Sequence, residues 1–277
     1  ATKYVIHDNK SRDISIGIVN IIIGSIILIL FATIVLSAVV TNWPYDLSIT
    51  RKWFSFDVMG TSGFKIFGNS IFVAFLSAIF GTMICFIAAY LCERSSSLKF
   101  AKRVVYFMGI LPNAIPGLTI GIAFMFFFNK QGNPLGFLYG TFAILILANI
   151  IHFFATPFLT MTNEMKKIDK EYENASEMMG VPWYGVIRRV IIPLSLPAIL
   201  ESFSYYFVNS MMTVSAVVFL YFPTTRLATI SMINKADIGE MAAASAVAVM
   251  IIITNIVFRV IFDKLSGRLR KNKKLSV

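Results

Sequence analysis

The stretch Asn174-Ala175-Ser176-Glu177-Met178-Met179-Gly180, with Pro193 thirteen residues after its glycine, separates two strongly apolar parts of the chain. Residues 164–179 mix acidic and basic side chains in a helix-forming composition, and Gly180 can adopt the left-handed conformation that ends a helix. Pro182 suits the first turn of a new helix, and Pro193 is expected to stop that helix. The stretch therefore predicts a helix, a glycine elbow and a short second helix that lies on a membrane surface.

The composition around this loop is that of an integral membrane protein. Of the 277 residues, 57% are hydrophobic and only 14% are charged, whereas soluble domains carry roughly a quarter charged residues. The mean hydropathy is +0.76. Apolar stretches long enough to cross about 30 Å of hydrocarbon cover residues 15–40, 67–92, 104–128, 138–160, 195–221 and 241–262. We therefore predict an all-α, polytopic membrane protein with six transmembrane helices, in which the charged loop joins helices 4 and 5.

The basic residues predict the orientation. If the N-terminus is cytoplasmic, 19 of the 25 Lys and Arg side chains fall on the cytoplasmic side and six fall outside. Because cytoplasmic loops carry the excess of Lys and Arg, both termini are expected inside, with 41–66, 129–137 and 222–240 outside. The net charge of +11 is thus a topology signal, with the basic tail resting on anionic lipid, and it does not indicate nucleic-acid binding.

The first apolar stretch is predicted to be a membrane helix, because it is too long for a cleavable signal peptide. The chain begins at Ala1, which leaves open a processed protein or one half of a longer fused protein. Asn69 and Ser70 are expected to cap the second helix. The third helix contains Pro112, Pro116 and Gly117, so it must break or kink inside the protein, where the freed carbonyl groups can find partners.

Sequence patterns for covalent chemistry are absent from the chain. There is no phosphate-binding loop, no zinc-protease or serine-hydrolase motif and no cluster of Cys and His residues. We therefore expect no catalytic residue, no metal site and no cofactor in this chain.

Polar residues inside the spans are the candidates for a solute path. Ser202, Tyr206, Asn209 and Thr213 recur at steps of four, three and four, which places them on one face of a helix. Asn209 and Asn149 fall near the middle of their spans. Two interpretations are equally open: the stripe lines a translocation path, or its members hydrogen-bond between helices and hold the bundle together.

The loop resembles the EAA loop of type I, binding-protein-dependent ABC importer permeases. Ala175, Gly180 and Pro193 match that family's pattern in register, and Ser176 replaces its second alanine. The family's glutamate position holds Asn174, with Glu173 one residue earlier. The Asn-Ser pair and the Pro-x-x-x-Pro-Gly break are also common in these permeases, so the resemblance covers roughly residues 65–262.

The resemblance implies a division into three parts: residues 1–64 hold the N-terminal tail, first helix and external loop, 65–262 form the permease domain, and 263–277 form a basic cytoplasmic tail. It implies a bacterial inner-membrane location and a pair of partner ATPase subunits, which bind ATP and Mg and dock on the loop. A second permease, identical or related, and an external solute-binding protein complete the importer. The residues implied to couple the loop to the ATPase are Glu173, Asn174, Ala175, Ser176, Gly180, Pro182 and Pro193.

The segments 213–221, 229–237 and 242–248 resemble permeases for 2-aminoethylphosphonate, which sit close to iron(III) and spermidine/putrescine permeases. The expected function is ATP-driven import of a small polar solute, with 2-aminoethylphosphonate favoured and iron(III) or a polyamine as the alternative. A secondary transporter or channel driven by an ion gradient is the rival class. It predicts carboxylates buried in the membrane, and the near-absence of acidic residues from the spans counts against it.

Overall fold

The computed structural model describes residues 10–60, 62–94 and 99–274, with side chains as far as Gly267. The longest helices are α1 (Lys10–Val39), α2 (Gly63–Arg94), α9 (Ile192–Met212) and α11 (Met241–Lys274). Shorter helices are α3 (Lys99–Ile110), α4 (Gly117–Phe128), α5 (Phe142–His152), α6 (Ala155–Lys167), α7 (Glu171–Met178), α8 (Trp183–Val186) and α10 (Ala228–Asp237). Single 3₁₀ turns are η1 (Lys52–Phe54), η2 (Phe56–Met59), η3 (Leu111–Ala114), η4 (Gly136–Leu138) and η6 (Pro223–Thr225), and η5 (Ile187–Ile191) is a π-turn.

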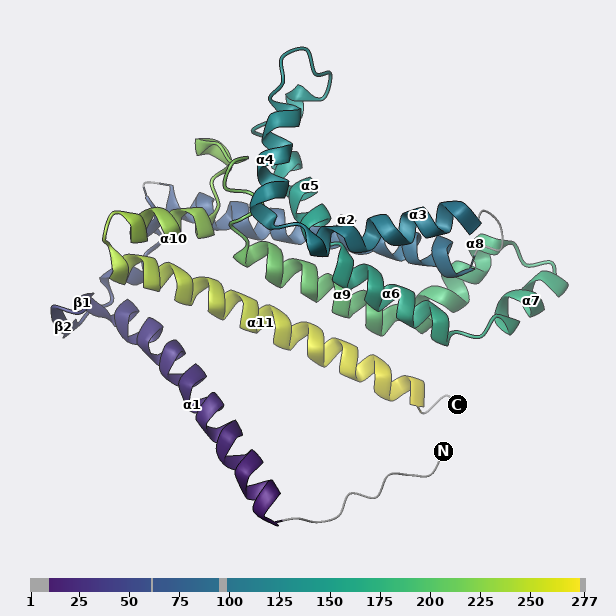
Figure 1. The fold of residues 1–277 in the computed structure, drawn as a ribbon, viewed down its shortest axis with the longest axis horizontal. Coiled ribbons are helices and arrows are strands. Elements are labelled where there is room, and N and C mark those ends of the chain that lie inside the picture. Colours follow the sequence, from purple (N-terminus) through teal and green to yellow (C-terminus); the bar gives the residue numbers. More distant parts are fainter. Residues whose placement is uncertain (1–9, 61, 95–98, 275–277) are drawn as a thin grey trace.

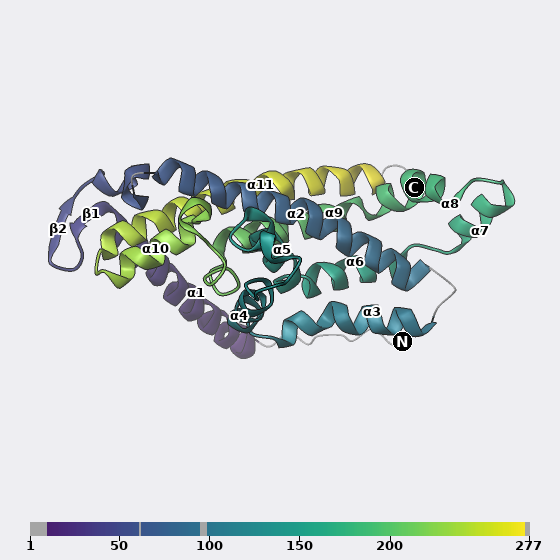
Figure 2. The same cartoon turned by 90° about the horizontal axis from the view of Figure 1, so that it is seen from above.

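The centre of the molecule is a bundle of roughly parallel and antiparallel helices, in which α2 packs against α9, α6 and α3, and α9 packs against α11 (Figure 1). The α7–α8 loop lies at one end of this bundle, and α10 lies at the other end beside a small antiparallel hairpin of β1 (Val40–Asn42) and β2 (Asp46–Ile49) (Figures 1 and 2). The hairpin was not predicted, and two hydrogen bonds from Ser48 lower the pKa of the Asp46 carboxyl group within it.

Basic residues that the topology prediction assigns to opposite sides of the membrane lie at opposite ends of the bundle. Arg94, Lys99 and Lys166 belong to helix ends beside the α7–α8 loop, whereas Lys65 and Lys235 belong to elements at the opposite end (Figure 1). The first three residues were predicted to be cytoplasmic and the last two external, and the bundle separates the two sets along its length. The orientation of the ends remains a prediction.

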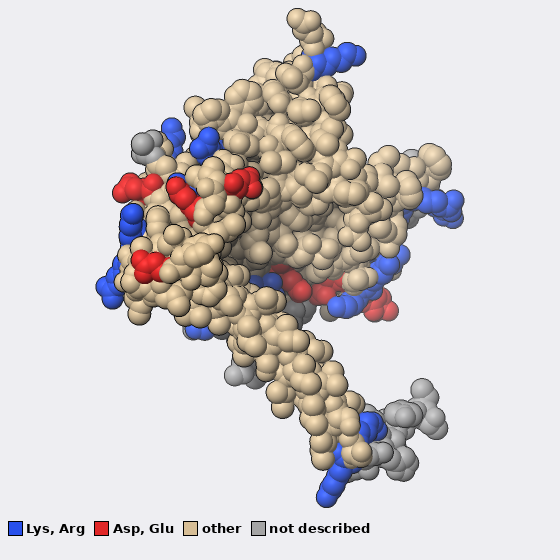
Figure 3. Space-filling view, turned by 60° about the vertical axis from the view of Figure 1, so that its left-hand side comes forward, with Lys and Arg blue, Asp and Glu red and all other residues tan. Residues whose placement is uncertain are grey.

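Helix α1 diverges from the bundle and is exposed along most of its length. Its contacts with the rest of the chain lie near its end, where Ala38 packs with Ala246 and Val249. In Figure 3 it projects as a largely uncharged rod that ends in basic side chains. An exposed apolar helix of 30 residues is compatible with a hydrocarbon environment, not with water.

Among the residues that the structure describes, three helices, or up to five spans if each bent pair counts as one, are long and apolar enough to cross a membrane. Helices α1, α2 and α11 qualify alone, and the bent pairs α3–α4 and α5–α6 qualify if each pair forms one broken span. The predicted span 195–221 is wrong at its end, because α9 stops at Met212 and the residues that follow are irregular, with turns over 215–220. The prediction of six spans therefore stays open.

The predicted break in the third helix is confirmed. Helices α3 and α4 meet at an angle of 110° across a 3₁₀ turn that begins at Leu111, and Pro116 directly precedes α4. A second break was not predicted: α5 and α6 meet at 56° across Phe153 and Phe154, and Pro157 in the first turn of α6 has no N–H to donate to the Phe153 carbonyl group. Together the two breaks direct the α4–α5 hairpin away from the bundle (Figure 1).

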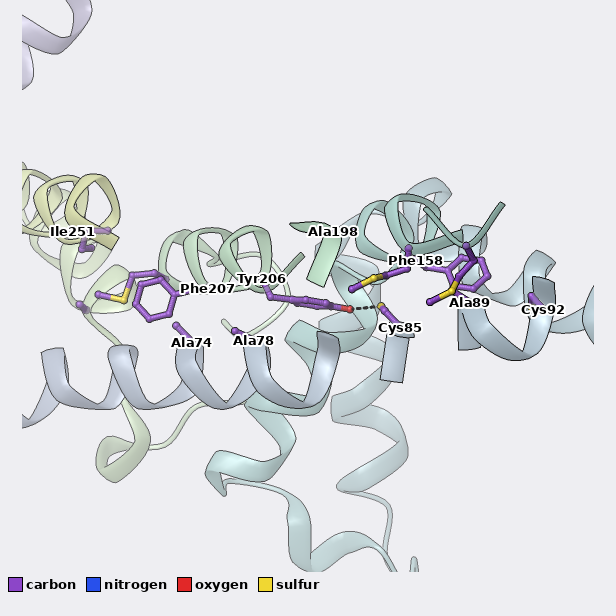
Figure 4. Packing of buried hydrophobic residues seen from close by; sticks show 14 of the residues in the cluster. Ala74, Ala78, Cys85, Ala89, Cys92, Phe158, Ala198, Tyr206, Phe207 and Ile251 are labelled. Carbon is purple, nitrogen blue, oxygen red and sulfur yellow. Dashed lines mark hydrogen bonds between the residues drawn. The ribbon is translucent and has the colours of Figure 1, made fainter. Parts of the chain in front are cut away.

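The second break is braced by neighbouring helices. The backbone N–H of Phe154 bonds to Ile151 at 3.3 Å instead of continuing the α-helical bond to Ile150. The hydroxyl group of Tyr206 donates to the freed carbonyl oxygen of Ile150 at 3.2 Å and also lies 3.3 Å from the sulfur of Cys85 (Figure 4). A side chain of α9 thus supplies the partner that the bend removes, as a break at membrane depth requires.

Helix α2 approaches its neighbours along a face of small side chains, which are Ala74, Ala78, Gly81, Cys85 and Ala89. Figure 4 shows the alanines beneath Tyr206 and Phe207 of α9. A Cβ atom on Gly81 would lie only 2.6 Å from the ring of Tyr206. Small residues permit this close approach in membrane bundles. Here they leave room for Tyr206, whose hydroxyl group bonds to Ile150 at the bend between α5 and α6.

Asn69 and Ser70 do not cap α2, and that expectation is wrong, because the helix begins earlier at Gly63. The Asn69 amide instead donates to the carbonyl groups of Thr224 and Arg226 at 3.2 and 3.1 Å. The Ser70 hydroxyl accepts the N–H of Ala228 at 2.7 Å. This polar pair therefore fastens the irregular segment between α9 and α10 to α2.

We predict that Gly81→Ala lowers the free energy of unfolding by about 1–3 kcal/mol, because the added methyl group overpacks the Tyr206 contact. Gly68→Ala is the matched control, since it lies on the same helix and its Cβ atom would meet nothing within 4 Å. Alanine is the better helix former, so the control should be neutral or stabilising. Thermal unfolding in detergent measures both, and equal behaviour of the two variants would contradict the close approach.

We also predict that Tyr206→Phe destabilises the fold by about 1–3 kcal/mol, because it leaves the buried Ile150 carbonyl oxygen without its partner. Tyr205→Phe removes a hydroxyl group from the neighbouring, half-buried position and should have a much smaller effect. The same unfolding assay tests the pair, and a neutral Tyr206→Phe variant would show that the bend does not need this brace.

Candidate functional site

The loop between the apolar segments begins with a turn that the sequence did not predict. The helix expected over 164–179 is interrupted, because α6 ends at Lys167 and α7 begins at Glu171. In the turn, the carboxylate of Asp169 accepts the N–H of Glu171 at 3.0 Å. Acidic Glu171 and Glu173 lie in the first turn of α7, where the helix dipole favours negative charge.

Helix α7 ends in the glycine elbow that the sequence predicted. Gly180 has φ +69°, and the N–H of Val181 bonds to the carbonyl group of Ser176 at 2.9 Å while that of Gly180 bonds to Glu177 at 3.0 Å. This pair of bonds is a Schellman motif, which requires the left-handed residue. The conformation expected for Gly180 is confirmed.

The prediction for Pro193 is wrong. Pro182 precedes α8 closely as expected, but the helical path then runs from Trp183 through η5 into α9 without a stop at Pro193. In η5 the bonding shifts to five residues, with the N–H of Ile192 donated to Ile187. Such π-turns interrupt the regular α-helical ladder, and this one places the irregularity directly before a proline that has no N–H to donate.

Large apolar side chains are exposed on this loop, although it lies beyond the apolar helices. Met178 is 90% exposed and Met179 is 72% exposed. Trp183 and Tyr184, which pack edge to face, are also largely exposed. Exposed apolar patches rimmed by polar residues mark interaction sites. The two methionines and the two aromatic residues flank the Gly180 elbow, and these four exposed residues are called the apolar tip.

The base of the loop is held by Arg94, the last residue of α2. Its side chain is only 2% exposed and donates to the carbonyl groups of Met165, at 2.9 Å, and Ile168. It also lies 3.4 Å from the carboxylate of Glu173. One guanidinium group thus contacts the end of α6, the following turn and α7.

The predicted coupling residues have different environments. Asn174 and Ala175 are exposed, whereas Ser176 is buried and its hydroxyl donates to the Tyr172 carbonyl group at 2.7 Å. Glu173 turns toward Arg94. A cavity of about 520 Å³ lies between the end of α2 and the loop, and both Glu173 and Asn174 contribute to its lining. The structure gathers Glu173 to Pro182 in one compact unit and places Pro193 farther along, in α9.

The predicted path residues lie in the bundle interior. Asn149 is fully buried, and its amide has no hydrogen-bond partner within the described residues. Ser202, Tyr206 and Thr213 are also buried. Tyr206 makes the bonds to Ile150 and Cys85, so this member of the stripe holds helices together. Asn209 is half-buried and donates to the carbonyl group of Tyr205 at 2.8 Å. The path assignment stays a prediction.

Across the ranges that the structure describes, no group of three or more His, Cys, Asp and Glu side chains is arranged to hold a metal ion. Cys85 and Cys92 are both buried and unpaired with each other.

An apolar helical bundle with bent helix pairs, and with a folded polar loop at one end, is the architecture of a polytopic membrane protein. Residues 81–271 match the family of binding-protein-dependent transport system inner membrane components. The match covers more than half of the chain, which belongs to this family of ABC importer permeases.

Relatives of this chain are named for the transport of different solutes. The ferric transport system permease protein FbpB of Actinobacillus pleuropneumoniae is 25% identical over 244 residues, or 87% of this chain and 35% of that protein. The spermidine/putrescine permease PotC of Escherichia coli (strain K12) is 23% identical over 231 residues, or 82% of each chain. The chain thus spans about a third of the ferric permease and most of PotC.

Solved structures agree with the fold. The crystal structure of a bacterial ABC transporter that imports the acidic polysaccharide alginate matches with a TM-score of 0.74 at 17% identity, covering 93% of this chain and 96% of that chain. The MetNI methionine ABC transporter matches with a TM-score of 0.60 at 16% identity, covering 73% and 93%.

Sequence reasoning missed two parts of the site. Arg94 was counted only as a cytoplasmic charge, because nothing in its spacing shows that it folds back onto α6 and α7. The apolar tip had a visible signal: Met178, Met179, Trp183 and Tyr184 are large apolar residues within a charged loop.

Proposed function

We propose that this chain is the membrane subunit of an ATP-driven importer and that the loop from α7 to α8 is the surface on which a partner ATPase docks. The single observation that carries the proposal is the apolar tip formed by Met178, Met179, Trp183 and Tyr184. Such side chains are costly to leave in water, and a protein partner that covers them gains that free energy. The resemblance of the surrounding motif to an EAA loop supports the same partner.

The complete importer contains two ATPase subunits, which bind ATP and Mg, a second permease and an external solute-binding protein. A solved relative of similar fold is described in complex with a substrate-bound periplasmic protein, which supports the last partner. Both chain termini lie in the cytoplasm in this proposal, and the split of basic residues supports that orientation. The chain itself performs no covalent chemistry; it converts movement at the loop into alternating access.

The solute is small and polar. The comparisons name ferric iron and spermidine or putrescine for the relatives, and they give no support to 2-aminoethylphosphonate. Uptake of each of the three solutes by cells that express the complete transporter, with and without depletion of ATP, separates them. Uptake that follows an ion gradient and persists without ATP would instead support the rival secondary transporter.

We predict that Gly180→Val weakens docking of the ATPase. A β-branched residue in the left-handed conformation costs about 1–2 kcal/mol, and since a Cβ atom there meets nothing within 4 Å, the effect is confined to the elbow. If the backbone at residue 180 leaves the strained conformation, the direction in which the apolar tip points changes. We expect reduced co-purification of the ATPase subunit and reduced uptake, with normal membrane insertion.

Gly239→Val is the matched control for this experiment. Gly239 has φ +84° and ends α10 with the same pair of backbone bonds, including Glu240 to Lys235 at 2.9 Å, but it lies at the opposite end of the bundle. It should leave ATPase docking intact. Normal docking by Gly180→Val, or equal loss in both variants, would show that the elbow does not aim the docking surface.

The translocation path is proposed to include Asn209. Asn209→Leu preserves the side-chain size but removes the amide, so we expect lower uptake with unchanged ATPase docking. Uptake by the purified, reconstituted transporter measures the first and co-purification measures the second. Unchanged uptake together with weakened permease association would identify the polar stripe as a packing contact between helices.

A further inference from the structure

We propose that Arg94 is the positioning residue that fixes α7 to the bundle, so that movement imposed on the docking loop is transmitted to α2 and α6 and is not absorbed by the turns around α7. This inference rests on the proposed function, and it assigns a role to a residue outside the loop motif. It also assigns Glu173 an internal partner, not a partner on the ATPase.

The contacts of Arg94 define the clamp. Its Nη2 atom donates to the carbonyl oxygen of Met165 at 2.9 Å and to that of Ile168, and its Nη1 atom donates to Oε2 of Glu173 at 3.4 Å. Only 2% of the Arg94 side-chain surface is exposed to solvent. A buried guanidinium group is therefore shared among backbone acceptors and a carboxylate.

The backbone acceptors explain why an arginine suits this place. Met165 and Ile168 lie at the end of α6 and just beyond it, where carbonyl groups lack partners within the helix. A positive charge is favoured there by the helix dipole. Only arginine presents several donors in a rigid plane, so it can bind these carbonyl groups and still reach α7. A lysine has a single nitrogen atom and cannot cover the same spread.

The turns on each side of α7 explain why a clamp is needed. Residues 168–170 separate α7 from α6, and the Gly180 elbow separates it from α8. Helix α7 makes its main helix contact with α8. Without a further link, both turns would let α7 rotate when a partner pushes on its tip. The contact of Glu173 with Arg94 supplies that link and ties α7 directly to the end of α2.

The clamp also has unused bonding capacity. Within the described part of the chain, Nε of Arg94 and Oε1 of Glu173 are buried and have no hydrogen-bond partner. Glu173 therefore contacts Arg94 through one oxygen atom, while the guanidinium group is anchored by the two backbone carbonyl groups.

A neighbouring ion pair provides the comparison. Lys166 lies 3.7 Å from Glu93, and half of the lysine side chain is exposed. Exposed pairs of this kind contribute little. Lys166→Met therefore removes a cation from the same end of the bundle without breaking the clamp, which makes it the matched control for Arg94→Met.

The first measurement uses the permease without any ATPase. Spin labels at Glu177→Cys on α7 and Asn163→Cys on α6, with Cys85 and Cys92 changed to alanine, report the distance between the two helices. We expect one narrow distance distribution in the parent protein and in Lys166→Met, and a clearly broadened one in Arg94→Met. Arg94→Lys should lie between them. A narrow distribution in Arg94→Met would overturn the proposal.

The second measurement uses the reconstituted transporter with its ATPase and binding protein. In the assembled transporter, Arg94→Met should lower uptake at least about tenfold relative to ATP hydrolysis, so that more ATP is hydrolysed per solute imported. Arg94→Lys should recover part of the uptake. An unchanged ratio of hydrolysis to uptake, or parallel loss of uptake and ATPase association, overturns a coupling role, since a purely structural residue would act in those ways.

Glu173→Gln keeps the experiment decisive if Arg94→Met fails to insert. It preserves the size of the side chain and removes the charge, and it should raise the ratio of hydrolysis to uptake severalfold; an unchanged ratio overturns the proposal. Failure of the proposed function is distinguishable, because the unaltered permease would then bind no ATPase, while the label distances would still decide whether Arg94 clamps α7.

Discussion

The hydroxyl group of Tyr206 satisfies the carbonyl oxygen that the bend between α5 and α6 leaves free at Ile150. A break at membrane depth is tolerated only where such groups find partners inside the protein. The tyrosine can reach this position because α2 offers Gly81 beneath its ring. The shape of the bundle, with the α4–α5 hairpin directed away from it, thus depends on one bond that three segments of the chain create together.

Helix α2 connects this centre to both ends of the molecule. Near its beginning, Asn69 and Ser70 hold the irregular segment that follows α9. In its middle, the small residues admit Tyr206. At its end, Arg94 binds α6 and the loop. A regular helix of 32 residues is stiff along its axis, so these three polar contacts are held at fixed separations by its backbone.

Features set by neighbouring residues could be predicted from the sequence, and features set by distant contacts could not. Gly180 is left-handed because glycine alone adopts that conformation without strain, and two prolines sufficed to predict the break before α4. The bend at Phe153 also has a local signal, Pro157 four residues later, but the tyrosine that supplies its missing bond, Tyr206, is distant in sequence. Pro193 misled the prediction because a π-turn and the packing of α9 override its usual effect. Arg94 acts through carbonyl groups about 70 residues away, a distance that no spacing rule covers.

The loop is therefore joined to the interior by two routes that converge. Along the chain, α8 leads through the π-turn directly into α9, which carries Tyr206 and Asn209. Through space, Arg94 joins α7 to α2 and α6. Both routes lead to the place where Tyr206 meets Cys85 and Ile150. A force on the loop can move α2, α6 and α9 together, or it can shift α9 against the other two. The second movement breaks the contact of Tyr206 with Cys85 of α2, so the proposed Arg94 clamp, which ties the loop to α2 and α6, favours the first movement.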